Sequence, residues 1–148
     1  MPTPVNDPLA ISLFSEISTI DHLLKTKLAK ILPFDMEPSH FAVLNYLSTL
    51  GSEKTPAQLA RSFNVTKGAM SNTVQKLLKM GYVHIRPDWE DGRSKLVSIS
   101  KAGVNARNDA VLAIEPIMED LKRGVGPEKI KALIPFLRAL RIVLNTSE

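Results

Sequence analysis

The apolar positions recur with the period of a helix over most of the chain. In residues 8–31, leucine and isoleucine lie three or four positions apart and so share one face of a predicted helix: Leu13, Ile17, Ile20, Leu24, Leu28 and Ile31. Asp7 followed by Pro8 favours a helix start, because aspartate caps free N–H groups and proline fits the first turn. We expect this helix to end at residues 32–34.

Three shorter helices are predicted next, at residues 38–50, 55–63 and 66–80. Thr55 with Gln58 three positions later is a capping-box pattern, and Thr66 can cap the last of the three. Gly51 and Gly81 end the first and the last, since glycine readily adopts the left-handed backbone of a helix terminus. The candidate inward residues are Phe41, Leu44, Tyr46 and Leu47 on the first helix and Met70, Val74 and Leu77 on the last.

The hydrophobic period then changes from 3.6 to 2. Apolar and polar residues alternate over residues 82–86 and 96–99, which predicts two strands joined by the polar loop of residues 87–94. A two-stranded hairpin is barely stable alone, so it must pack on the preceding helices. Two more helices follow, from Lys101, capped by Ser100, and from Pro127, with Pro116 and Pro135 as expected kinks.

This order of elements predicts a mainly α fold with a small antiparallel β-hairpin wing. Residues 36–101 form a winged helix-turn-helix lobe, in which one helix supports another that lies in the major groove of DNA. We expect residues 1–148 to make one domain, with helices at 8–32 and 102–145 flanking the lobe.

The formal net charge of +4 is unevenly distributed. Residues 52–101 hold nine Lys and Arg against four Asp and Glu, a net of +5, whereas the remainder holds ten against eleven, a net of −1. The basic excess therefore belongs to the predicted lobe, where it favours an anionic partner. A lysine-rich solvated surface is the alternative that composition alone leaves open.

The helix predicted at residues 66–80 carries three lysines and no acidic residue. Its outward face bears amides, a hydroxyl and lysines; Asn and Gln pair with adenine, and Lys pairs with guanine or phosphate. Gly68 lacks a side chain, so its backbone can approach a phosphate closely. The candidate DNA contacts on this helix are Thr66, Lys67, Gly68, Ser71, Asn72, Gln75 and Lys76. An ordinary solvated helix face is the alternative, but exposed helices usually mix charges of both signs.

The loop between the predicted strands contains a second candidate contact. Arg93 follows Asp91 by two residues and precedes Lys95, and an arginine at a hairpin tip can enter a narrow minor groove. Asp91 can orient Arg93 through a charge-assisted bond. The alternative is a loose surface ion pair worth at most about 1 kcal/mol. We take Asp91, Arg93 and Lys95 as wing contacts.

Two stretches carry a family resemblance: TPAQLARSFNVTKGAMSNTVQKLLKMGYV and RPDWEDGRSKLVSISKAG. The chain resembles the MarR family of winged helix-turn-helix transcriptional regulators, whose wing signature is matched by Asp91, Arg93, Ile99, Ser100 and Gly103. The resemblance implies sequence-specific double-stranded DNA binding, with helix 66–80 in the major groove and wing 87–95 in the minor groove. It also implies a homodimer on a near-palindromic operator, and a repressor released by a small aromatic or phenolic effector.

The apolar surface of the flanking helices agrees with dimerisation, because symmetric pairing is the common way to cover such faces. Asn72, Gln75 and Leu78 depart from the residues usual in the family, so the operator cannot be transferred from relatives. Glu37 replaces the usual Ser or Thr cap before helix 38–50 and is a weaker cap. For an effector we can name only candidate lining residues: His22, Phe41, Tyr46 and Trp89.

Other function classes find little support in the sequence. The chain has no cysteine, no HExxH, no glycine-rich phosphate loop and no G-x-S-x-G, so we expect no enzyme, metal site or cofactor. No apolar run approaches the roughly 18 residues of a membrane span, and we expect no signal peptide and a cytoplasmic protein. The remaining rival is a winged helix that binds another protein without specific DNA binding.

Overall fold

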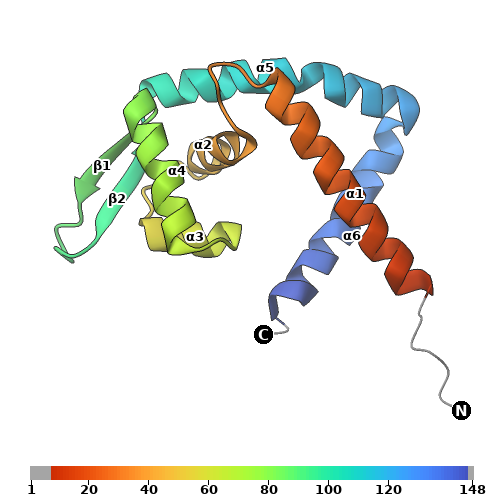
Figure 1. The fold of residues 1–148 in the computed structure, drawn as a ribbon, viewed down its shortest axis with the longest axis horizontal. Coiled ribbons are helices and arrows are strands. Elements are labelled where there is room, and N and C mark those ends of the chain that lie inside the picture. The colour runs from red at the N-terminus through yellow and green to blue at the C-terminus, as the bar shows by residue number, and fades with distance from the viewer. Residues whose placement is uncertain (1–7, 147–148) are drawn as a thin grey trace, which may run out of the picture. The chain divides into compact units, whose positions relative to one another are not determined.

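The computed structural model describes residues 8–146, so the expected cap Asp7 lies outside the described range. These residues form six helices and one two-stranded antiparallel sheet (Figure 1), which confirms the predicted mainly α fold with a hairpin wing. The bounds are α1 Pro8–Ile31, α2 Pro38–Leu50, α3 Pro56–Phe63, α4 Lys67–Met80, β1 Val83–Pro87, β2 Lys95–Ile99, α5 Lys101–Gly124 and α6 Pro127–Thr146.

The chain divides into two compact parts, with the boundary inside α5 between Ala113 and Ile114. The first part holds α1 to α4, the hairpin and the start of α5; the second holds the rest of α5 and α6. Pro116 and Pro135 lie inside helices that continue through them. A single domain over residues 1–148 stays a prediction.

The helix boundaries follow from local hydrogen bonds. Thr55 Oγ1 accepts the Gln58 N–H at 3.1 Å, and Gln58 Oε1 accepts the Thr55 N–H at 2.9 Å, so the predicted capping box is present. Thr66 Oγ1 accepts the Ala69 N–H at 3.1 Å and starts α4. Gly81 ends α4 with φ of 82°, a conformation in which a side chain would cost energy.

The core of the first part lies where α2, α3, α4 and the hairpin meet. Its most deeply buried side chains are Val43, Leu44, Leu47, Leu59, Val74, Leu77 and Val97. The predicted inner face of α4 is therefore confirmed. On α2 the prediction needs correction: Phe41 and Tyr46 are only half-buried, whereas Val43 and His40 are buried.

The hairpin pairs Val83 with Ile99 and Ile85 with Val97, in the predicted antiparallel arrangement. Pro87 pairs with Lys95 and thus ends β1, so the wing loop is one residue shorter than predicted. A third backbone segment joins the sheet at one residue: the Lys54 N–H donates to Val97 O at 3.0 Å, and the Val97 N–H donates to Lys54 O at 2.8 Å. This bridge fastens the hairpin to the loop between α2 and α3.

The start of α5 is locked against the turn that follows α4. Ser100 Oγ accepts the Gly103 N–H at 3.0 Å, which confirms Ser100 as the cap, and donates to Gly81 O at 2.7 Å. The Ser100 N–H donates to Tyr82 O at 2.9 Å. A Cβ atom on Gly103 would overlap Tyr82 O and lie 2.8 Å from Ile99 Cγ1, so only glycine fits there.

The long helices at either end keep exposed apolar faces. α1 has no buried residue; most of its leucines and isoleucines are between about two-fifths and four-fifths exposed, and Leu28 and Ile31 are half-buried. α6 likewise exposes Leu133, Ile134, Phe136 and Leu137. Single exposed leucines are ordinary on protein surfaces, but contiguous rows of exposed apolar side chains are not. Such rows are typical of surfaces through which proteins associate.

The Gly103→Ala variant should lose stability, because the added methyl group meets backbone that cannot move aside. We expect the free energy of unfolding to fall by about 1–3 kcal/mol or more, with a lower melting temperature in calorimetry or circular dichroism. Gly68→Ala is the matched control: no atom lies within 4 Å of its Cβ position, so this helical site should gain slightly from alanine. Equal melting temperatures for the two variants would contradict the packing described for Gly103.

Candidate nucleic-acid interface

The residues proposed for major-groove contact are all exposed on α4 and at its cap. Thr66, Lys67, Gly68, Ser71, Asn72, Gln75 and Lys76 lie at the surface, while the opposite side of the helix is buried through Met70, Val74 and Leu77. This burial fixes the rotation of α4 about its axis. The amide and lysine side chains are consequently presented together, without a carboxylate among residues 66–80.

Gly68 lies in the first turn of α4, and nothing in the described residues comes within 4 Å of the place where its Cβ would stand. The backbone is therefore uncovered where the helix dipole and the free N–H groups favour an anion. The described residues give Gly68 no packing role, and the close approach of a phosphate to its backbone stays a prediction.

The wing tip is organised around Asp91. Its Oδ1 accepts the Arg93 N–H at 3.1 Å and lies 3.4 Å from Arg93 Nε, so the predicted pair is present. Ser94 Oγ lies 3.4 Å from Asp91 Oδ2, and the Asp88 N–H donates to Ser94 O at 3.0 Å. The Arg93 side chain is 94% exposed. The loop is thus held by its backbone, while the guanidinium projects into solvent; Lys95, also exposed, follows it on β2.

Sequence reasoning missed an ion pair at the base of the wing. Arg86 on β1 donates through Nε and Nη2 to Glu53 Oε1, at 3.2 and 3.0 Å, and Nε lies 2.9 Å from Oε2. Glu53 lies in the loop before α3, far from Arg86 in sequence. Trp89 is exposed, with its ring centre 5.8 Å from the Arg86 guanidinium carbon.

His40 was also missed as a structural residue. It is buried in α2, and its Nδ1 accepts the Glu37 N–H at 3.0 Å, so the imidazole satisfies the helix start that the Glu37 side chain does not cap. Burial lowers the pKa of His40 below its ordinary value of 6.5; the Glu37 carboxylate raises this pKa in opposition, and Lys76 lowers it further. His40 is therefore neutral, as the accepted hydrogen bond requires.

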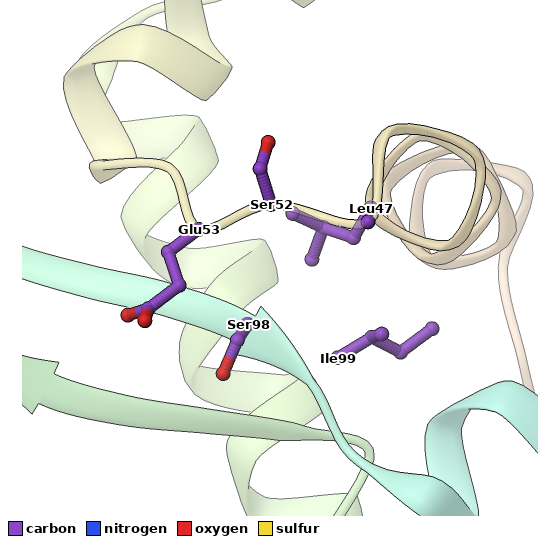
Figure 2. Close-up of a pocket in the computed structure, with 6 residues that line it drawn as sticks. Leu47, Ser52, Glu53, Ser98 and Ile99 are labelled. Carbon is purple, nitrogen blue, oxygen red and sulfur yellow. The ribbon is translucent and has the colours of Figure 1, made fainter.

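The two hollows described on this chain, one beside α2 and β2 and one on α4, are lined by none of the candidate effector residues. Tyr46 instead faces α3, with its hydroxyl 3.0 Å from Ser62 Oγ and its ring edge-on to Phe63 at 5.3 Å. His22 is exposed on α1, and Trp89 lies against Arg86. A hollow of about 290 Å³ beside the end of α2 and β2 (Figure 2) is lined by other residues: Leu47, Gly51, Ser52, Glu53, Ser98 and Ile99.

Residues 8–146 contain neither a candidate metal-ligand cluster nor a candidate membrane-spanning helix. No cluster of three or more His, Cys, Asp or Glu side chains there is placed to hold a metal ion. None of the helices in that range is long and apolar enough to cross a membrane.

Stability should fall with acidification partly through His40. Because the pKa of His40 is lower in the folded than in the unfolded chain, the unfolded chain binds the extra proton; stability is full above about pH 6.5 and declines below it. His40→Gln keeps an acceptor at the third helical position, as Gln58 does in α3, but cannot titrate. The melting temperature of His40→Gln should therefore drop less between pH 7 and pH 5 than that of the wild type. Equal drops for both proteins would refute the role of His40 in the acid sensitivity.

Known proteins and a family model are similar in sequence to this chain. Residues 34–94 match the sequence model of the MarR family. The chain is 32% identical over 89 residues to YdgG of Bacillus subtilis (strain 168), an uncharacterized HTH-type transcriptional regulator, covering 59% of each protein. It is 36% identical over 81 residues to a similarly described regulator of Mycobacterium leprae (strain TN), covering 52% of this chain and 57% of that protein. The match thus spans less than two-thirds of either relative.

Solved structures share the fold at low sequence identity. The organohalide-sensing regulator RdhR, bound to 2,4-dichlorophenol, superposes with a TM-score of 0.79 at 20% identity, over 98% of this chain and 87% of that one. A mutant MarR from E. coli complexed with operator DNA gives 0.78 at 20% identity, over 93% and 99%. The predicted resemblance is confirmed: residues 34–94 match the MarR family, and the described chain has the fold of MarR regulators.

Proposed function

We propose that this chain is a sequence-specific, double-stranded DNA-binding transcriptional regulator. Its recognition helix, residues 66–80, lies in the major groove, and its wing, residues 87–95, lies in the minor groove. One observation carries this proposal: the exposed face of α4 joins amides and lysines without any carboxylate, and the buried face fixes its orientation. Amides read adenine edges and lysines read guanine or phosphate, so this surface suits a DNA groove.

The charge distribution and the comparisons support the same function. The basic excess of +5 lies in residues 52–101, which contain α3, α4 and the wing. The match to MarR includes residues 52–94 of this segment, and one protein with this fold is a MarR complexed with operator DNA. The chain does not need catalytic groups for this activity, and we assign it no enzymatic function.

The working form in this proposal is a homodimer on a near-palindromic operator. The exposed apolar faces of α1 and α6 supply surface for association with a second copy, and symmetric dimers are the commonest soluble assembly. We assign the protein to the cytoplasm, where its DNA would be. A small aromatic or phenolic effector that releases a repressor from DNA is supported by a related fold with bound 2,4-dichlorophenol.

Binding should be specific for the DNA upstream of the protein's own gene and should weaken steeply with salt. Each lysine or arginine that neutralises a phosphate releases counterions, so a plot of log affinity against log salt should slope by about −0.9 per contact. Fluorescence anisotropy with labelled upstream duplex measures this, with scrambled duplex as control. If the upstream duplex is bound no better than scrambled duplex at any salt, the rival protein-binding role is favoured instead.

Single substitutions should separate base reading from backbone contact. Asn72→Ala and Gln75→Ala should change base preference, costing about 1–3 kcal/mol on the best site. Arg93→Ala and Gly68→Ala should weaken binding to all sequences, the second because its methyl group displaces the phosphate without touching protein. Melting temperatures control for folding. Wild-type affinity and base preference in all four variants would show that DNA binds elsewhere.

A further inference from the structure

Three side chains from three segments meet at the base of the wing: Glu53 before α3, Arg86 on β1, and Trp89 in the wing loop. We call them the wing-base stack. The guanidinium of Arg86 contacts both of the others: it donates two hydrogen bonds to Glu53 Oε1, and its Cζ lies over the Trp89 ring, 5.8 Å from the ring centre. Its Nη1 also donates to Pro87 O at 3.0 Å, at the point where the wing loop begins.

The stack adds a constraint that the hairpin lacks by itself. Two strands of five residues each form a marginal unit whose direction is easily changed. The segment of Glu53 and Lys54 holds the hairpin twice: Lys54 through backbone bonds to Val97 on β2, and Glu53 through the ion pair to Arg86 on β1. In Figure 2 the Glu53 side chain extends from its loop toward β2.

We propose that Glu53 and Arg86 form a positioning pair that aims the wing, and with it Arg93, at DNA. The inference rests on the proposed function. The Asp91–Arg93 contact is long and exposed, so it orders the tip but cannot set the direction of the whole wing. The Glu53–Arg86 pair is only 35% and 42% exposed, and two N–H groups of the planar guanidinium converge on Glu53 Oε1, which restrains both partners.

The direction in which DNA affinity changes when Glu53 is removed distinguishes a positioning role from a purely electrostatic one. Glu53 is one of four acidic residues within the basic segment 52–101. If it acted only through its charge, its removal would lessen repulsion of phosphate and strengthen DNA binding. If it positions the wing, its removal weakens binding although a negative charge has been lost.

The test is a double-mutant cycle of Glu53→Gln with Arg93→Ala, read by anisotropy on the upstream duplex. Glu53→Gln alone should weaken binding by roughly three- to thirtyfold, and by less than about twofold when Arg93 is already alanine, because positioning acts through Arg93. Arg86→Lys keeps the positive charge but loses the fork, and should weaken binding similarly. Glu90→Gln, which removes a carboxylate from the wing loop itself, is the charge control and should bind as tightly as wild type or more tightly.

A second readout needs no DNA. Trp89 is the only tryptophan in the sequence, so intrinsic fluorescence reports on the wing base alone. Glu53→Gln and Arg86→Lys should shift its emission and lower its anisotropy at an unchanged melting temperature.

The outcomes separate the two proposals. If the wild type fails to bind specific DNA, the proposed function falls. The positioning pair is overturned, while the DNA-binding function stands, if Glu53→Gln binds the upstream duplex as tightly as the wild type or more tightly. It is also overturned if Glu53→Gln weakens binding by the same factor in the Arg93→Ala background as in the wild type.

Discussion

The winged helix-turn-helix depends on one close contact, between the turn after α4 and the first turn of α5. Ser100 caps α5 and at the same time donates to Gly81 O, and Gly103 lets the helix backbone reach Tyr82 O. The end of the recognition helix, the start of β1 and the end of β2 therefore meet at the first turn of α5. A shift at this junction would move the recognition helix and the wing relative to each other, which a groove-reading surface cannot tolerate.

The interface proposed for DNA has two parts: α4, whose orientation is fixed by its buried face, and the wing tip, which is exposed to solvent. Buried Met70, Val74 and Leu77 hold α4 in place, so its polar face needs no rearrangement before binding. The wing tip, in contrast, is held by its own backbone turn and by Asp91, and its Arg93 guanidinium stays in solvent. Amide side chains on a helix of fixed orientation suit base reading, whereas a solvent-exposed arginine suits the negative potential of a narrow minor groove.

Local pattern was enough to predict most of the fold. The capping box, the single cap residues, the glycines and the change of period located the helices and strands to within a residue or two, because each signal acts through neighbouring residues. The exposure of the candidate DNA contacts on α4 followed from the helical period. The long-range contacts could not be read in this way: the Lys54–Val97 bridge and the Glu53–Arg86 pair join residues more than thirty positions apart. The burial of His40 could not be predicted for another reason: a histidine near a helix start is as compatible with an exposed position as with a buried one.

The central claim is that this chain reads DNA with paired recognition helices. Selection of bound sequences from a random duplex library tests it most directly, because partner class and site symmetry are obtained together. The account predicts an enriched motif with two inverted half-sites about one helical turn apart, centre to centre. A library that stays random after repeated selection would contradict the claim, as would an enriched single half-site without an inverted partner.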